Sequence, residues 1–182
     1  GQACTIEDWI KGFEDNNEID LKQFKLWYEQ AGTPIVTVQE SFKNSQYTLK
    51  FKQTLNNKNN EPMLIPISVG LLNKKGEEVL ETNLLTLSER EQEFTFNNIK
   101  TKPIPSILRD FSAPVIINYK TTDEQNAFLL QYDTNEFNKW EAGQKLARSS
   151  IIQTILEGKP IDGLFANSIK KVISNKGLEP GY

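Results

Sequence analysis

Histidine, the side chain that most often carries acid–base or metal chemistry near neutral pH, is missing from all 182 residues. Its absence excludes Ser-His-Asp and Cys-His catalysis within the chain, together with the H-E-x-x-H zinc helix and every other histidine-ligated metal site. Cys4 is the only cysteine, so the chain can form neither an internal disulfide nor a cysteine-rich zinc site. We therefore expect no catalytic residue, no cofactor-binding residue and no metal ligand here.

Charged side chains that are neighbours in the sequence offer two weaker candidates for chemistry. The acidic residues within 14–20 lack the D-x-D-x-D-G spacing of a calcium loop, so we interpret them as a solvated surface. Arg109 and Asp110 could form a catalytic ion pair or an interdomain salt bridge. A lone acidic and basic pair is seldom catalytic, and we favour pairing at the surface or at an interface.

The three tryptophans, Trp9, Trp27 and Trp140, could form a platform on which sugars stack. All three fall at apolar positions of expected helices, where tryptophan usually anchors the packing between elements. We therefore favour core or interface roles for them. Trp27 and Trp140 are our candidates for residues that fix the central part of the chain against its neighbours, together with Gly32 and Pro34 at the change from helix to strand.

Two short helices are expected before the first strand. The first begins with a capping box at Thr5 and carries apolar side chains at helical spacing. Asp20 and Gln23 predict a second capping box, and Gly32 is expected to end that helix in the left-handed conformation. Pro34 pushes the residue before it into extended geometry. We therefore expect a strand directly after Pro34.

About seven short strands are expected over residues 34–120. Residues 47–51 and 65–71 alternate apolar and polar side chains, the period of a strand with one dry and one wet face. Pro66 cannot donate a ladder hydrogen bond, which favours an edge or a bulge there. The pattern predicts a mixed, mainly β fold built on a seven-stranded, immunoglobulin-like antiparallel sandwich. The remaining strands are expected at 35–38, 77–80, 84–87, 94–96 and 115–119.

Helical periodicity returns after residue 120. Asp133 and Glu136 predict a capping box at the start of a long helix that ends near Gly158 and Pro160. Asp162 is expected to cap a second helix that runs to about residue 173. Two helices cannot bury both apolar stripes on each other alone, so we expect further helices to follow.

The chain is thus divided into a helical end of a preceding domain at 1–33, a sandwich at 34–120, and the first helices of a following domain at 121–182. Gly1 is not a methionine and no leader follows it, so we expect an excerpt of a longer chain. The 21 basic and 24 acidic residues argue against nucleic-acid or anionic-membrane partners. We expect a cytoplasmic location.

Three sequence matches, in the right order, resemble the aminopeptidase N family of zinc metallopeptidases. The segment W-Y-E-Q-A-G-T-P-I-V at 27–36 is similar to the seam where the catalytic domain of that family enters a β-sandwich. F-S-A-P-V at 111–115 resembles the last sandwich strand of the bacterial alanyl aminopeptidases. F-N-K-W-E-A-G-Q-K-L at 137–146 resembles their first long helix after the sandwich. Residues 1–3 and the helix after them resemble the closing helices of the catalytic domain.

This resemblance implies a parent enzyme with an N-terminal β-domain, a zinc domain, a small sandwich and a helical C-terminal domain. It implies that the parent, with zinc as its cofactor, releases N-terminal amino acids from peptides. The family's H-E-x-x-H and G-A-M-E-N motifs do not occur in this chain, so we assign none of their roles to its residues. We expect a non-catalytic spacer whose partners are the other domains of the parent, with apolar faces that favour self-association.

The alternative hypothesis is a free-standing immunoglobulin-like binding or adhesion module. It accounts for the sandwich but leaves the helices at both ends unexplained. The residues upstream of Gly1 would discriminate the two hypotheses, because an H-E-x-x-H helix favours the first and a signal peptide favours the second.

Overall fold

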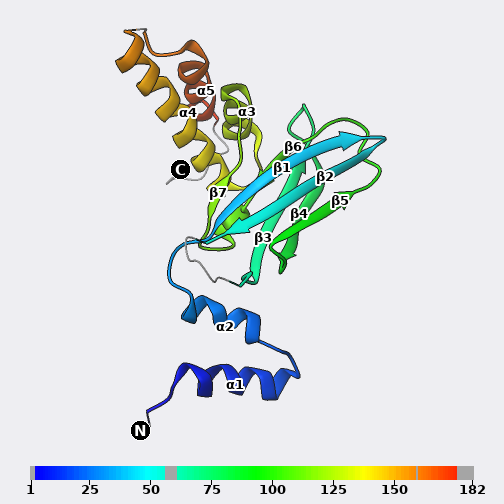
Figure 1. Ribbon diagram of the computed structural model, residues 1–182. Coiled ribbons are helices and arrows are strands. Elements are labelled where there is room, and N and C mark those ends of the chain that lie inside the picture. Colours follow the sequence, from blue (N-terminus) through cyan, green and yellow to red (C-terminus); the bar gives the residue numbers. More distant parts are fainter. Residues whose placement is uncertain (1–2, 56–60, 159, 176–182) are drawn as a thin grey trace.

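Two β-sheets form the centre of the molecule in a computed structural model that describes residues 3–55, 61–158 and 160–175. Helices α1 and α2 lie at one end of the sheets, and α3, α4 and α5 lie at the other (Figure 1). One sheet has the strand order β5-β2-β1-β7 and the other has the order β4-β3-β6. The strands are β1 (Ile35–Lys43), β2 (Gln46–Thr54), β3 (Ile65–Leu72), β4 (Glu78–Leu87), β5 (Glu91–Phe96), β6 (Ile104–Ile107) and β7 (Ile116–Asn118).

The predicted sandwich of seven strands is confirmed in the described residues. β1 pairs with β7 in parallel over three residues, and the other pairings that the structure describes are antiparallel. Two details differ from the expectation. The pieces expected at 77–80 and 84–87 are one continuous strand, β4, and β6 was not expected.

The main hydrophobic core lies between the two sheets, as the alternation of side chains predicts. On β2, Tyr47, Leu49 and Phe51 are fully buried, while the residues between them face outward or lie at intermediate depth. Their partners across the sandwich come largely from β3, whose Ile65 and Ile67 are also fully buried. The period-two pattern thus sets the inward face of each strand.

Pro66 lies in β3, which is the central strand of its sheet and not an edge strand. β6 pairs with β3 only from Val69 to Leu72, so β3 has β4 as its partner at Pro66. On the side of β3 that faces away from β4, no strand that the structure describes pairs with Pro66, so the N–H that Pro66 lacks costs no ladder bond on that side. The pairing of β3 with β4 is irregular from Val69 onward, where the register shifts twice.

The N-terminal helices are α1 (Ile6–Asn17) and α2 (Lys22–Glu29). The expected capping box at Thr5 is present. The one expected at Asp20 is wrong, because α2 has Leu21 at its N-cap position without a side-chain bond. Asp20 instead accepts a hydrogen bond from the backbone N–H of Lys22, and the amide of Gln23 turns toward the sandwich.

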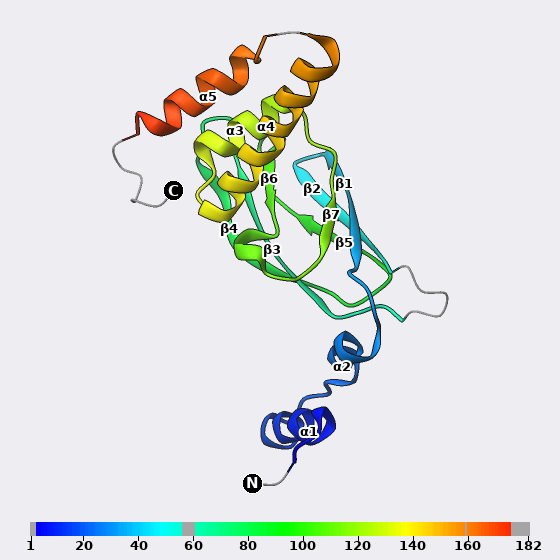
Figure 2. The ribbon, with the colours of Figure 1, turned by 90° about the vertical axis from the view of Figure 1, so that its left-hand side faces the viewer.

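The C-terminal helices are α3 (Asp123–Tyr132), α4 (Glu136–Glu157) and α5 (Gly163–Ile173). They share a second core with Leu72 of β3, and Figure 2 shows them grouped at the end of the sandwich far from α1. Gly158 ends α4 in the left-handed conformation and Asp162 caps α5, both as expected. None of the helices in the described ranges is long and apolar enough to cross a membrane.

Two expectations about this end of the chain are wrong. Helix α3 was not expected, although Thr122 and Gln125 form a complete capping box at its start. Asp133 and Glu136 do not cap α4, whose N-cap residue is Asn135. Asp133 follows α3 and is buried, and its carboxylate pairs with an arginine from the sandwich instead of capping the helix.

Candidate functional site at the junction of the sandwich and the helices

A buried arginine joins the sandwich to the C-terminal helices. Arg109 stands at the start of a short 3-10 turn, η1 (Arg109–Phe111), one residue beyond the end of β6, and its side chain is 1% exposed. One terminal nitrogen, Nη1, lies 2.6 Å from Oε1 of Glu78 on β4. The other, Nη2, lies 3.1 Å from Oδ1 of Asp133, between α3 and α4. One guanidinium therefore binds a carboxylate from each side of the junction.

Neutral side chains complete this arginine cluster. Arg109 Nε donates to Ser106 Oγ at 3.0 Å, and Nη1 also donates to Thr82 Oγ1 at 2.9 Å. From α4, the amide of Asn138 donates to Ser106 Oγ at 2.8 Å and to the carbonyl oxygen of Ile107 at 3.0 Å. Strands β4 and β6 and helix α4 thus meet in one hydrogen-bond network, which is the arrangement that makes a buried charge tolerable.

The two carboxyl groups of the cluster respond to their surroundings in opposite ways. Hydrogen bonds from Thr134 and Arg109 hold the pKa of Glu78 below its usual value. Burial raises the pKa of Asp133. Hydrogen bonds from Ser106 and from the backbone N–H of Asn135, and the charge of Arg109, oppose this rise without cancelling it. Removal of the arginine would therefore leave Asp133 buried without a counter-charge.

Gly70 on β3 provides the space that the guanidinium occupies. A Cβ atom at this position would lie 2.1 Å from Arg109 Cζ and 2.4 Å from both terminal nitrogens. No side chain fits there while the arginine is in place. This role of Gly70 was not predicted from the sequence, although a lone glycine inside a strand pattern is a signal for close approach of another group.

The expected pairing between Arg109 and Asp110 is wrong. Asp110 is exposed and its carboxylate accepts a hydrogen bond from the amide of Asn135 at 2.7 Å. Arg109 does lie at an interface, but its partners are 24 and 31 residues away in the sequence. Local sequence gives no sign of contacts at that range.

Helix α2 is attached to the other end of the sandwich through polar side chains. The indole N–H of Trp27 donates to the carbonyl oxygen of Leu64 at 2.9 Å, and the ring packs against the sandwich core. The amide of Gln23 donates to the carbonyl oxygens of Pro62 and Ser88. Trp27 was a sequence candidate for such a contact, whereas Gln23 was not.

Gly32 and Pro34 lie in the passage from α2 to β1. Gly32 has φ of +109°, a conformation that favours glycine. The expectation that Gly32 ends α2 is wrong, because the helix stops at Glu29 and Gln30 is its C-cap residue in an extended conformation. Pro34 is buried, and its carbonyl oxygen accepts a hydrogen bond from Ile116 N at 2.9 Å. This bond lies at the start of the parallel pairing of β1 with β7.

Trp140 lies on α4 with 53% of its surface exposed. Its ring is 5.9 Å from that of Phe137, which in turn is 5.6 Å from that of Phe111 in η1. The three rings form a row that crosses the surface from the helices to the sandwich. Trp9 is also half exposed, on α1.

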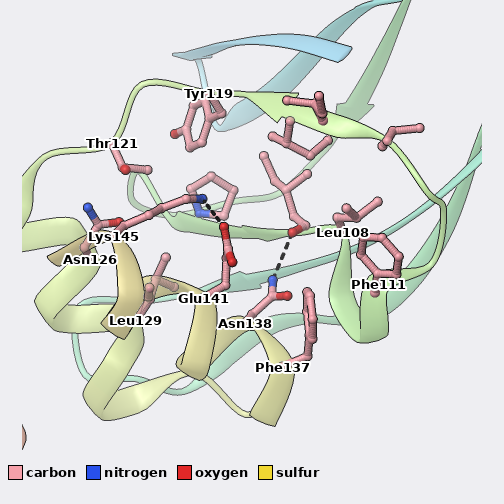
Figure 3. A pocket seen from close by; sticks show the side chains of 16 residues that line it. Leu108, Phe111, Tyr119, Thr121, Asn126, Leu129, Phe137, Asn138, Glu141 and Lys145 are labelled. Carbon is pink, nitrogen blue, oxygen red and sulfur yellow. Dashed lines mark hydrogen bonds and ion pairs between the residues drawn. The ribbon is translucent and has the colours of Figure 1, made fainter. Parts of the chain in front are cut away.

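A cavity of about 290 Å³ lies beside this aromatic row. It is bounded by residues 105–119 of the sandwich and by α3 and α4, and we term it the junction pocket (Figure 3). Phe111 and Phe137 lie at one end of it in Figure 3, and Thr121 and Asn126 lie at the other. The pocket therefore has an apolar end and a polar end.

Metal-ligating side chains do not gather in the part of the chain that the structure describes. Histidine is absent from the whole sequence, and no group of three or more Cys, Asp or Glu side chains with metal-binding geometry forms among the described residues. Within the acidic group at 14–20, Glu14 accepts a hydrogen bond from Leu21 N. Cys4 is free and exposed.

The fold and the site together define an immunoglobulin-like sandwich that is joined to a group of helices through a buried ion-pair cluster. Residues 32–120 match the family model DUF3458, a domain of unknown function described as an Ig-like fold. Residues 123–182 match DUF3458_C, a domain of unknown function described as ARM repeats.

Curated relatives match this chain across both of these regions. The chain is 32% identical to aminopeptidase N of Escherichia coli strain K12 over 198 aligned residues, which cover 99% of this chain and 23% of that protein. It is 33% identical to aminopeptidase N of Haemophilus influenzae over 169 residues, 86% of this chain and 19% of that protein. A crystal structure of Legionella pneumophila aminopeptidase A in complex with aspartic acid has a TM-score of 0.86 and 36% identity, covering 97% of this chain and 21% of that one.

The chain belongs to the aminopeptidase N family and corresponds to a segment of such a protein. It spans about a fifth of the length of the curated relatives that it matches.

Proposed function

We propose that this segment is a non-catalytic spacer between the catalytic domain and the C-terminal helical domain of a zinc-dependent aminopeptidase. The observation that carries the proposal is the arginine cluster, which ties strands β4 and β6 to helices α3 and α4 through one buried guanidinium. We retain the boundaries 1–33, 34–120 and 121–182 for the three parts. The extents of the two family matches support this division.

A spacer has to hold its neighbours at a fixed angle, and both ends of the sandwich have the contacts for this. At one end Trp27 and Gln23 bind carbonyl oxygens of the sandwich. At the other end Arg109 is bound by two carboxylates and two hydroxyls. In the parent, this angle would set how closely the helical domain covers the catalytic cleft, and hence which peptides reach it.

We place the zinc ion and all reacting groups in other parts of the parent. Zinc peptidases of this class use histidine and glutamate ligands, and this chain has no histidine. The names of the relatives support a parent that releases N-terminal amino acids from peptides. The free thiol of Cys4 is compatible with a reducing compartment, and we propose a cytoplasmic location.

The other domains of the parent are the proposed partners, and peptides are the proposed substrates of the parent. Large apolar side chains at the end of α4 and on α5 are more than 70% exposed, namely Ile155, Leu156 and Ile173. Such faces favour association. We propose that the chain by itself self-associates, and light scattering over a dilution series tests this. A strict monomer at every concentration would contradict it.

An activity assay tests the spacer proposal. The purified chain is incubated with an alanyl chromogenic amide, with and without added zinc. We expect no turnover above buffer in either case, because the chain has no histidine to bind zinc. Zinc-dependent turnover that co-purifies with the chain would overturn the proposal.

A further inference from the structure

The junction pocket combines an apolar end with a polar end in one cavity of about 290 Å³. Leu108, Phe111 and Phe137 line the apolar end, and Figure 3 places them together on one side of the cavity. Asn126 and Lys145 lie on the opposite side. Concave sites of this kind, mostly apolar with a few convergent polar groups, are typical of small-molecule binding. The volume suits a ligand much smaller than a drug molecule.

Asn126 on α3 offers a polar group to a ligand in the pocket. The residue is only 5% exposed and lines the pocket. None of the hydrogen bonds found among the described residues involves its carboxamide, and its nitrogen and oxygen are not among the fully buried side-chain atoms that lack a partner. The carboxamide is therefore accessible where the residue lines the pocket. The carboxamide offers both a donor and an acceptor. A bound molecule with complementary groups would pair with this carboxamide in place of solvent.

Glu141 and Lys145, one turn apart on α4, add a negative and a positive group beside Asn126. Glu141 Oε1 lies 3.4 Å from Lys145 Nζ, and both side chains are somewhat less than half exposed. Figure 3 shows Lys145 extending toward Glu141 along the pocket. Pairs of this spacing usually belong to a solvated helix face. This pair differs because both members line a cavity that is also lined by Asn126, whose carboxamide takes part in none of the hydrogen bonds found among the described residues.

We propose that the junction pocket binds a free α-amino acid with a large apolar side chain. The ammonium group of the ligand would pair with Glu141, and its carboxylate would pair with Lys145 and accept a hydrogen bond from Asn126. Its side chain would lie against Leu108 and Phe111 at the apolar end. A ligand that carries an ammonium group and a carboxylate on the same carbon atom matches the pair on α4 better than a singly charged one. This site is separate from the spacer function and does not rest on it.

Chemical-shift titration by NMR tests the proposal on the intact chain. L-leucine and L-phenylalanine are expected to shift amide signals of residues 121–145 in a saturable manner. Isocaproate lacks the ammonium group and isoamylamine lacks the carboxylate, so each is expected to bind about tenfold more weakly or worse, the usual effect of losing one charged hydrogen bond. L-aspartate keeps both charges but lacks the apolar side chain, and it is expected to bind weakly as well.

Variants at the pocket separate specific binding from surface association. Glu141→Gln and Lys145→Gln change partly exposed side chains, and each should weaken L-leucine binding about tenfold. Asn126→Ala should weaken it further, and the two α4 variants keep the test valid if this buried variant fails to fold. Glu29→Gln is the matched control, because Glu29 belongs to an equivalent pair with Lys25 on α2, away from the pocket. This variant should bind L-leucine with unchanged affinity.

Several results would overturn the proposal. They are the absence of saturable shifts, equal affinity for isocaproate and L-leucine, or unchanged affinity in Glu141→Gln. L-leucine could also bind to this chain but not to the full-length parent. That result would show that another segment fills the cavity, and it would equally exclude an amino-acid site in the intact protein.

Discussion

Arg109 is the residue on which the junction of sandwich and helices depends. Its guanidinium reaches a carboxylate on β4 and another between α3 and α4, and it is almost completely buried. A buried ion pair contributes little compared with a well-packed apolar group, but removal of one partner leaves a charge in a medium that cannot solvate it. The cluster therefore fixes geometry more than it adds stability.

Replacement of this arginine should be severe. In Arg109→Met the apolar stem is kept, but Asp133 loses its counter-charge, so we expect the free energy of unfolding to fall by about 3–5 kcal/mol. Urea unfolding of the purified chain measures this. Arg148→Met is the control, because Arg148 is exposed on α4, and it should change stability by about 0.5 kcal/mol or less. Equal effects of the two substitutions would contradict the role of the cluster.

Gly70 should be coupled to Arg109. Gly70→Ala places a methyl group where the guanidinium lies, so we expect it to destabilise the chain while Arg109 is present. In the Arg109→Met background the clash is with a flexible side chain, and the cost of Gly70→Ala should be smaller. A double-mutant cycle by urea unfolding measures the difference. Gly12→Ala on α1, where a Cβ meets nothing within 4 Å, should not destabilise.

Two buried tyrosines are expected to make the folded chain less stable at alkaline pH. The hydroxyl of Tyr47 donates to Glu40 Oε2 at 2.6 Å. Burial, reinforced by Glu40, raises the pKa of Tyr47 and of Tyr119 far above the ordinary value. The unfolded chain therefore releases these protons at about pH 10 while the folded chain keeps them, so stability is lost as the pH rises above that value.

Phenolate absorbance checks this expectation. The chain has five tyrosines, so at most three should ionise before the unfolding transition. Ionisation of four or five in the folded chain would show that Glu40 and burial do not have this effect.

At the residue scale the sequence predicted types of contact but not partners. The adjacent charges of Arg109 and Asp110 indicated ion pairing at a surface or an interface. The real partners, Glu78 and Asp133, are brought in by the sandwich pairing and by the turn after α3. The space at Gly70 likewise exists only once β3 lies beside β6.

At the scale of elements, α2 is fixed to the sandwich by few contacts, and Trp27 is central to them. Trp27→Phe keeps most of the apolar surface but leaves the Leu64 carbonyl oxygen without its donor. We expect a loss of about 1 kcal/mol, together with faster amide hydrogen exchange in α2. Trp9→Phe is the control, since Trp9 is 47% exposed, and its effect should stay within about 0.5 kcal/mol. Unchanged exchange in Trp27→Phe would contradict the attachment.

The strands were easier to predict than the helices. Apolar and polar side chains alternate on β2 and β3 because each strand has one buried face. A short stretch of sequence is enough to show this pattern. Helix α3 lacks a clear apolar stripe because it buries Asn126 as well as Leu129 and Leu130. Its capping box at Thr122 and Gln125 was the available signal. The capping role expected for Asp133 failed because a long-range ion pair uses that side chain instead.

At the scale of the whole molecule, the proposed spacer function requires the sandwich and helices α3 and α4 to behave as one body. The shared second core, to which β3 contributes Leu72, and the arginine cluster both act across this junction. A segment of this kind can transmit a fixed orientation between the parts of a longer chain, which is what the proposed spacer function needs.

Pulsed electron paramagnetic resonance tests this rigidity most directly. Spin labels at Lys52→Cys on β2 and Gln153→Cys on α4, both exposed positions, report the distance across the junction once Cys4 is replaced by serine. With Arg109 intact we predict a single narrow distance distribution, and the same labels with Arg109→Met should give a broader one. A broad or multiple distribution with Arg109 in place would contradict the spacer account.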